Sequence, residues 1–325
     1  MDKNPPLYPL KFTPILKEKI WGGKKLSKLF QKNGTGNIGE SWELSGVDEN
    51  VSVAANKPLS GMSLTNLIEI YGASLLGEKV FKHFGNTFPL LFKFIDAEAD
   101  LSVQLHPNDT LAKERHNGFG KTEMWYIMHA EENARLILGF NRKMDESTYL
   151  EFLSENKLTE ILKEEKVDKG DAFFIAPGTV HAIGAGVLLA EIQQTSDLTY
   201  RIYDWDRPDT DGTKRELHTE LALAAINYEE AKAKITYPDK KNQPVLLKTN
   251  RYFETNKLRL TQPLSRDLSG LDSFVVYMCV DGSANLMADN IMTTMSTGET
   301  ILVPACLKNI SFDTTSATFL EVYIP

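Results

Sequence analysis

The stretch GDAFFIAPGTVH, residues 170–181, decides the fold class that we expect for this chain. Gly170 and Asp171 are a turn signal, and the four residues 172–175 form an apolar run of strand length. Pro177 and Gly178 are a second turn signal, and His181 follows three residues after that glycine. The pattern predicts a short buried strand between two turns that delivers an imidazole to the next segment.

Short apolar or alternating runs of the same kind recur along the chain between Gly, Asn, Asp and Pro residues. They cover residues 41–44, 90–95, 124–128, 134–138, 172–175, 187–192, 274–280 and 319–324. Many short strands predict a sandwich or a barrel. Helical patterns lie between some of them and are interpreted as insertions: a helix from about Leu64 capped by Ser63, two short helices between Asp145 and Lys166, and one around 217–225.

Composition narrows the class of protein. The chain has 325 residues and a formal net charge of −8, which argues against nucleic acid as the main partner because phosphate backbones need a basic surface. No apolar run approaches the roughly 20 residues of a membrane helix, and residues 1–10 lack the pattern of a signal peptide. The two cysteines, Cys279 and Cys306, are expected to be reduced core thiols. We therefore expect a cytoplasmic protein.

Two domains are expected. The segment 228–249 is polar and rich in lysine, so we place a boundary there and predict domains at 1–235 and 236–325. The two parts also resemble each other. EMWYIM (123–128) and GDAFFIAP (170–177) are echoed by SFVVYM (273–278) and GETILVP (298–304). Ser273 then stands in the place of Glu123, and Lys308 in the place of His181, which predicts a second β-domain that lacks metal ligands.

A metal site is predicted from four residues in three separate segments. Gln104 and His106 are two residues apart, so on a strand their side chains share one face. Glu123 and His181 lie in two further segments that are interpreted as strands. Two imidazoles, a carboxylate and an amide oxygen suit a divalent metal such as zinc, with one position open for chemistry.

The order of strand, Gly-Asp turn, apolar strand, proline turn and histidine resembles the second conserved motif of the cupin superfamily. In that superfamily the histidine binds a metal inside a jelly-roll barrel. The resemblance implies a mainly β fold: two cupin-like jelly-roll β-barrels with inserted helices in the N-terminal half.

A narrower resemblance extends from about Lys17 to Ile226 and is to type I mannose-6-phosphate isomerase, in its short bacterial form. It is carried by residues 21–23 (WGG), 39–43 (GESWE), 89–93 (PLLFK), 101–109 (LSVQLHPND), 120–123 (GKTE) and 191–201. The resemblance implies one zinc ion per chain, bound by Gln104, His106, Glu123 and His181. Thr122 stands where many members of the family have proline.

The resemblance also implies the chemistry. The enzyme would interconvert mannose 6-phosphate and fructose 6-phosphate through an enediol(ate), with Glu191 among the acid/base residues. Lys121 lies two residues before Glu123, so on a strand it shares the face of that residue and would lie near the metal. We prefer Glu191 as the proton shuttle and Lys121 as a polarising or ring-opening group. Arg201 is expected to contact substrate, and Asp197 to orient it.

Substrate binding and the alternatives complete the sequence-based predictions. The expected substrate-binding residues are Lys93, Arg201 and Ser102. Lys93 is a charge within an apolar run and needs a partner, and the guanidinium geometry of Arg201 suits phosphate. Other metal-dependent cupin enzymes, a phosphosugar isomerase or an iron oxygenase, stay open, as does a non-catalytic sugar-phosphate-binding cupin. The partner is a small phosphosugar, and the protein is expected to be a monomer or a homodimer. Residues 204–207 are interpreted as a solvated turn.

Overall fold

The computed structural model describes residues 4–209 and 212–325. Contacts between residues divide the chain into two units. Unit A comprises residues 16–41 and 94–234, and unit B comprises the residues up to 15 together with 42–93 and 235–325. The last boundary lies next to the expected one at residue 235. Residues 42–93, however, group with the C-terminal part of the chain, so unit B is discontinuous in sequence, unlike the two consecutive domains that we expected.

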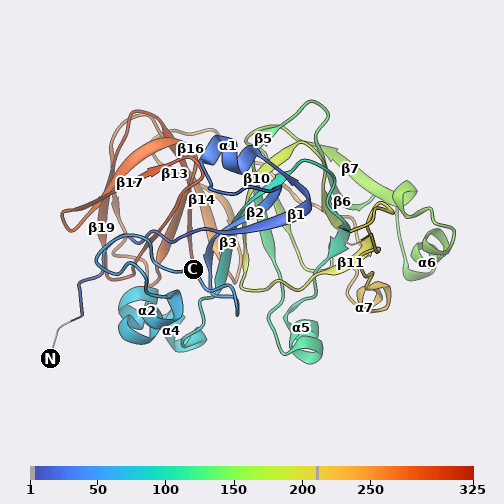
Figure 1. The fold of residues 1–325 in the computed structure, drawn as a ribbon, viewed down its shortest axis with the longest axis horizontal. Helices are drawn as coiled ribbons and strands as arrows, with labels where there is room; N and C mark the ends of the chain where they lie inside the picture. The colour runs from blue at the N-terminus through green and yellow to red at the C-terminus, as the bar shows by residue number, and fades with distance from the viewer. Residues whose placement is uncertain (1–3, 210–211) are drawn as a thin grey trace. The chain divides into compact units, whose positions relative to one another are not determined.

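Unit A consists of two β-sheets with helices at their periphery (Figure 1). One sheet has the order β1-β2-β3-β10-β5-β8-β12, and the other has the order β11-β4-β9-β6-β7. Strands that lie wholly or partly in unit A are β1 (Ile15–Gly23), β2 (Ile38–Ser45), β3 (Leu90–Ala97), β4 (Val103–Leu105), β5 (Glu123–Ala130), β6 (Arg135–Phe140), β7 (Leu162–Lys166), β8 (Ala172–Ile175), β9 (His181–Ile183), β10 (Val187–Gln194), β11 (Tyr200–Tyr203) and β12 (Lys234–Ile235). Its helices are α1 (Lys25–Phe30), α5 (Asp109–His116), α6 (Glu146–Ser154), the 3₁₀ helix η1 (Leu158–Ile161) and α7 (Thr219–Leu223).

Unit B is organised around one long strand. The eight strands of its C-terminal sheet are β13 (Pro244–Thr249), β14 (Glu254–Leu260), β15 (Leu264–Asp267), β16 (Val275–Ala288), β17 (Ile291–Ser296), β18 (Thr300–Val303), β19 (Asn309–Asp313) and β20 (Ala317–Tyr323). They follow the order β13-β14-β20-β16-β19-β15, with β17 and β18 also paired to β16. Its helices are α2 (Leu64–Tyr71), α3 (Ala73–Leu76) and α4 (Glu78–Phe84).

The structure confirms the mainly β prediction. Each of the eight predicted runs overlaps an observed strand, and helices occur in each of the predicted places. The Ser63 side chain accepts a hydrogen bond from the Asn66 N–H at 3.2 Å, which is the predicted cap of α2. None of the described helices is long and apolar enough to cross a membrane. Both cysteines are free, and Cys279 is buried as expected. Cys306 is exposed, so the prediction of a second core thiol was wrong.

One arrangement of three strands occurs in both units. In unit A, β5 lies between β10 and β8; in unit B, β16 pairs with both β20 and β18. Glu123 lies opposite Gln193 and Ile175. Val275 lies opposite Tyr323 and Val303. The strand register therefore matches Glu123 with Val275.

The sequence comparison was wrong about this register, because it matched Glu123 with Ser273. Equivalent turn contacts support the corrected register: the Ile127 N–H donates to the Asp171 carbonyl, and the Cys279 N–H donates to the Glu299 carbonyl, both at 2.9 Å. An apolar strand carries no marker of register, and a shift of two residues keeps every side chain on the same face. The expectation that unit B lacks this ligand is unchanged, since valine binds no metal.

The Trp-Gly-Gly motif of residues 21–23 has a packing explanation. A Cβ atom on Gly22 would lie 2.4 Å from the Gly39 nitrogen, and one on Gly23 would lie 2.4 Å from Asp96 Oδ2. The buried Asp96 carboxylate accepts the Lys25 N–H at 2.7 Å, at the first residue of α1. Gly22 thus allows β1 to lie against β2, and Gly23 leaves room for the Asp96 side chain that binds the start of α1.

Candidate active site

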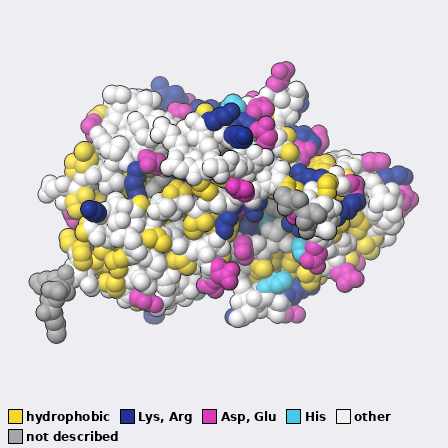
Figure 2. All heavy atoms as spheres, in the orientation of Figure 1, with side chains coloured by type: hydrophobic (Ala, Val, Ile, Leu, Met, Phe, Trp, Pro, Cys, Tyr) yellow, Lys and Arg dark blue, Asp and Glu magenta, His cyan; other side chains and the backbone are white. Residues whose placement is uncertain are grey.

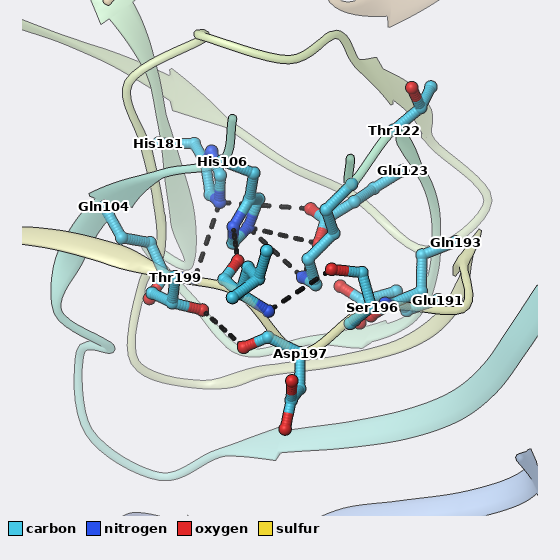
Figure 3. A network of polar contacts seen from close by, with 12 residues as sticks. Gln104, His106, Thr122, Glu123, His181, Glu191, Gln193, Ser196, Asp197 and Thr199 are labelled. Atoms are coloured by element: carbon cyan, nitrogen blue, oxygen red, sulfur yellow. Dashed lines mark hydrogen bonds and ion pairs between the residues drawn. The ribbon is translucent and has the colours of Figure 1, made fainter. Parts of the chain in front are cut away.

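Three buried side chains from different strands of unit A converge on one point (Figure 3). His106 directly follows β4, while Glu123 and His181 are the first residues of β5 and β9. One donor atom from each residue lies within 4.8 Å of the others, and each residue is only 1% exposed. Strand ends hold all three side chains, which is the rigid support that a metal site requires.

The backbone fixes how the two imidazoles are oriented. His106 Nδ1 lies 2.8 Å from the carbonyl oxygen of Leu198, and His181 Nδ1 lies 2.9 Å from that of Thr179. Because a carbonyl only accepts, each Nδ1 carries the proton and each Nε2 keeps a lone pair. These Nε2 atoms face the Glu123 carboxylate, at 3.2 Å for His106 and 3.9 Å for His181.

Gln104 is placed beside this group. Its Cα is the cross-strand partner of His181, and its Nε2 lies 3.5 Å from His181 Nε2. The Ser102 hydroxyl, which is buried, donates to Gln104 Oε1 at 3.3 Å. The oxygen and nitrogen of an amide are assigned from their hydrogen bonds, and turning this amide over would present its oxygen to the same point. The Gln104 amide therefore lies beside the His106, Glu123 and His181 group, where its oxygen would be a fourth donor, and Ser102 contacts Gln104.

The Lys121 ammonium lies among these donor atoms. Lys121 is buried and pairs with Glu123 Oε1, and its Nζ is 3.2 Å from His106 Nε2. A positive charge is thus already accommodated by the carboxylate and the lone pair of one imidazole.

The electrostatics of the group favour neutral imidazoles and an ionised carboxylate. Burial, supported by the Lys121 charge, lowers the pKa of His106 to about 4, and burial also lowers the pKa of His181. Burial alone would raise the pKa of Glu123, but the Lys121 ammonium and the neighbouring His106 hold it well below the ordinary value. Two neutral imidazoles with free Nε2 lone pairs and one carboxylate fit a divalent metal ion.

Glu191 lies on the same inner face of unit A. Its Cα pairs with that of Trp125 in β5, and the next inward-facing pair along these strands is Gln193 with Glu123. Glu191 is 3% exposed and its Oε2 accepts the indole N–H of Trp125 at 2.7 Å. The structure therefore brings a second buried carboxylate to the strand next to the metal-binding group.

Arg201 is the cross-strand partner of Gln104, so it shares the face of the predicted ligand. Its Nη1 donates to the Glu216 carbonyl at 2.8 Å, and its backbone N–H donates to His218 Nδ1 at 3.1 Å. Burial, with the charge of Arg215, lowers the pKa of Arg201. Asp197 is exposed, and in Figure 3 its carboxylate points away from the histidines. Glu216, rather than Asp197, therefore supplies the contact to the guanidinium.

Comparison with known proteins places the chain in a family. Residues 9–122 match the model of the catalytic domain of type I phosphomannose isomerase. Mannose-6-phosphate isomerase ManA of Bacillus subtilis is 35% identical over 300 residues, which cover 91% of this chain and 93% of the relative. This chain belongs to the type I phosphomannose isomerase family. A mannose-6-phosphate isomerase of Streptococcus mutans is 30% identical and covers 94% of the chain and 95% of the relative.

Solved structures agree with this assignment to the phosphomannose isomerases. The crystal structure of the mannose 6-phosphate isomerase from Bacillus subtilis superimposes with a TM-score of 0.88 at 30% identity, covering 97% of this chain and 99% of that one. A putative mannosephosphate isomerase from Archaeoglobus fulgidus shares the fold, with a TM-score of 0.79 at 21% identity and 98% of each chain covered. The predicted family and the cupin-like fold are thus confirmed.

Two predicted features of this phosphomannose isomerase look different in the structure. Lys93 belongs to unit B, where its buried ammonium lies 4.9 Å from the centre of the Trp42 ring, so its role in substrate binding stays a prediction. Residues 204–207 are not simply a solvated turn. Asp204 is 6% exposed and accepts hydrogen bonds from Arg207 at 2.9 Å and from Arg215 at 2.6 Å. The signal that was missed is an acidic residue followed by two arginines in one loop.

Proposed function

We propose that this protein is a zinc-dependent aldose–ketose isomerase that interconverts mannose 6-phosphate and fructose 6-phosphate. One observation carries the proposal: a buried group of two imidazoles and a carboxylate has Glu191, a second buried carboxylate, on the neighbouring strand. Membership of the family supports the substrate, since its relatives carry the name mannose-6-phosphate isomerase.

The metal would be held by His106, Glu123 and His181, with Gln104 as a fourth ligand once its amide is turned over. Zinc supplies charge stabilisation at the substrate oxygens without redox chemistry. We propose one zinc ion per chain, because the three buried donors form a single group.

The protein's own residues then divide the remaining work. Moving a hydrogen between C1 and C2 through an enediol(ate) needs a base that takes a proton from one carbon and returns it to the other. We assign this role to Glu191. Lys121 holds a proton next to the sugar oxygens and assists ring opening.

The anionic parts of the substrate need cationic partners. Arg201 stabilises the phosphate or the developing enediolate charge, since a guanidinium group can donate two parallel hydrogen bonds to two oxygens of one anion. Lys93 is a second phosphate ligand in this proposal, whereas Ser102 acts through Gln104. We retain Asp197 as a residue of the active site, and we propose a cytoplasmic monomer or homodimer. Basic and acidic side chains are interspersed on the face drawn in Figure 2, which suits a small substrate rather than a nucleic acid.

The test is to identify the product directly. Purified protein incubated with mannose 6-phosphate in deuterated water is followed by NMR. We expect fructose 6-phosphate with deuterium incorporated at the carbon that Glu191 reprotonates. Glu191→Gln should lower the rate by about a hundredfold or more while bound zinc is unchanged, and the exposed His129→Ala on β5 is the control that should keep full activity. Formation of no ketose by the zinc-loaded wild type would refute the proposal.

The same three ligands also suit an iron oxygenase, because two histidines and a carboxylate form its usual metal-binding triad. That alternative predicts bound iron and oxygen consumption with a small-molecule substrate. Oxygen uptake measured with an electrode, using protein loaded with iron, separates it from an isomerase.

A further inference from the structure

An aromatic donor and a carboxylate face each other across equivalent strand pairs of units A and B. In unit A, Trp125 of β5 lies opposite Glu191 of β10. In unit B, Tyr277 of β16 lies opposite Glu321 of β20. The corrected register makes these two pairs equivalent, since each is two residues along the strand from the matched pair Glu123 and Val275.

The hydrogen bonds in the two pairs match as well. The indole N–H of Trp125 donates to Glu191 Oε2 at 2.7 Å, and the Tyr277 hydroxyl donates to Glu321 Oε2 at 2.7 Å. All four residues are at most 3% exposed. Bonds to a charged acceptor in a buried place are among the stronger ones in proteins, so both carboxylates are held in a fixed orientation.

The two carboxylates differ in their further surroundings. Arg266 donates to both oxygens of Glu321, at 3.0 and 2.8 Å, so a positive charge neutralises the carboxylate of unit B. The Trp125 donor of unit A is a neutral group. In addition, the Trp125 ring packs edge-to-face on the His181 ring, with centroids 5.3 Å apart and planes at 78°.

We propose that Trp125 is the positioning residue for Glu191. It acts through Glu191 and does not itself react, so the inference rests on the proposed function. Its indole donates a hydrogen bond to the Glu191 carboxylate and packs against the ring of the metal ligand His181. These two contacts fix the position of the proton shuttle relative to the metal centre. A base that transfers a proton between adjacent carbons must be held within a fraction of an ångström, and a free carboxylate would rotate.

The test compares Trp125→Phe with Trp125→Tyr. The two variants have rings of equal size and differ by one hydroxyl, which unit B shows can reach the carboxylate from this position. We expect Trp125→Phe to lower kcat about tenfold or more, with KM for mannose 6-phosphate changed less than about twofold. Trp125→Tyr should recover most of kcat. Metal content, measured by mass spectrometry, should be equal in both variants.

Tyr277→Phe is the matched control, because it removes the equivalent donor from Glu321 in unit B. It should lower the Tm and leave kcat unchanged. If Trp125→Phe fails to fold, benzothienylalanine at position 125 keeps the shape of tryptophan, replaces the N–H by sulfur, and should show the same loss of kcat.

Three results would overturn the inference while the wild type is active: equal kcat in the Phe and Tyr variants, an unchanged kcat in the Phe and benzothienylalanine variants, or an equal loss in Tyr277→Phe. A wild type that fails to convert mannose 6-phosphate would remove the proposed function itself, and the inference with it.

Discussion

His106 and His181 are kept neutral by their position, and this gives the protein a pH-dependent stability. Burial lowers the pKa of His106 to about 4, and the pKa of His181 is also lowered. An unfolded chain binds a proton at each histidine near pH 6.5, whereas the folded chain does not until the pH is lower. Acid therefore favours the unfolded state between about pH 6.5 and 4.

We predict that the metal-free protein loses stability as the pH falls from 6.5 to 5, by about 1.5 kcal/mol for His106 and by a further amount for His181, whose pKa is shifted in the same direction. Urea denaturation of chelated protein at the two pH values measures this. His106→Asn, which cannot be protonated, should lose about 1.5 kcal/mol less than the wild type over the same interval. An equal loss in both proteins would show that His106 is not responsible.

The residues of the site were predicted to different degrees. His106, Glu123 and His181 were accessible because their segments are marked by turns and by an alternating pattern, and the structure brings all three together. Trp125 was missed, since its partner Glu191 lies 66 residues away on another strand. A contact between strands depends on register, which the local pattern of residues does not contain.

At the scale of elements, the start of α1 depends on Gly23. The turn signals around β8 predicted that strand to the residue, whereas the role of Gly23 becomes visible only when Asp96 arrives from another strand. We predict that Gly23→Ala lowers the free energy of unfolding by about 1–3 kcal/mol, because its Cβ would lie 2.4 Å from the Asp96 carboxylate.

Urea denaturation of the metal-loaded protein checks this prediction. Gly270→Ala is the matched control, because a Cβ atom there has no neighbour within 4 Å and the stability should change by less than about 0.5 kcal/mol. Equal stability of the Gly23→Ala and Gly270→Ala proteins would show that the carboxylate moves aside without cost.

At the scale of the whole molecule, the set of chain segments that form unit B could not be predicted from the sequence. A polar segment marked the boundary near residue 235, but no local signal shows that residues 42–93 pack with the C-terminal strands. The link is made by contacts of long range. The Ala305 N–H donates to the Leu75 carbonyl at 2.9 Å, and the Phe88 and Phe274 rings lie 4.8 Å apart.

We therefore predict that a chain ending at residue 234 does not form a stable protein. It would leave the buried Leu75, Leu76 and Phe88 without their partners Phe274, which directly precedes β16, and Ala305. Expression of residues 1–234, followed by thermal denaturation, should give insoluble protein or no cooperative transition. A soluble truncated chain with full isomerase activity would contradict the discontinuous unit B.

The measurement that tests the central claim most directly is the conversion of mannose 6-phosphate to fructose 6-phosphate in a coupled assay. It compares protein as purified, protein treated with a chelator, and chelated protein with zinc restored. We predict that chelation abolishes activity, that zinc restores it, and that chelated His181→Ala regains less than about one hundredth of it with zinc. Full activity after complete removal of metal would contradict the account, because the buried group of His106, Glu123 and His181 would then not be a metal centre that the reaction needs.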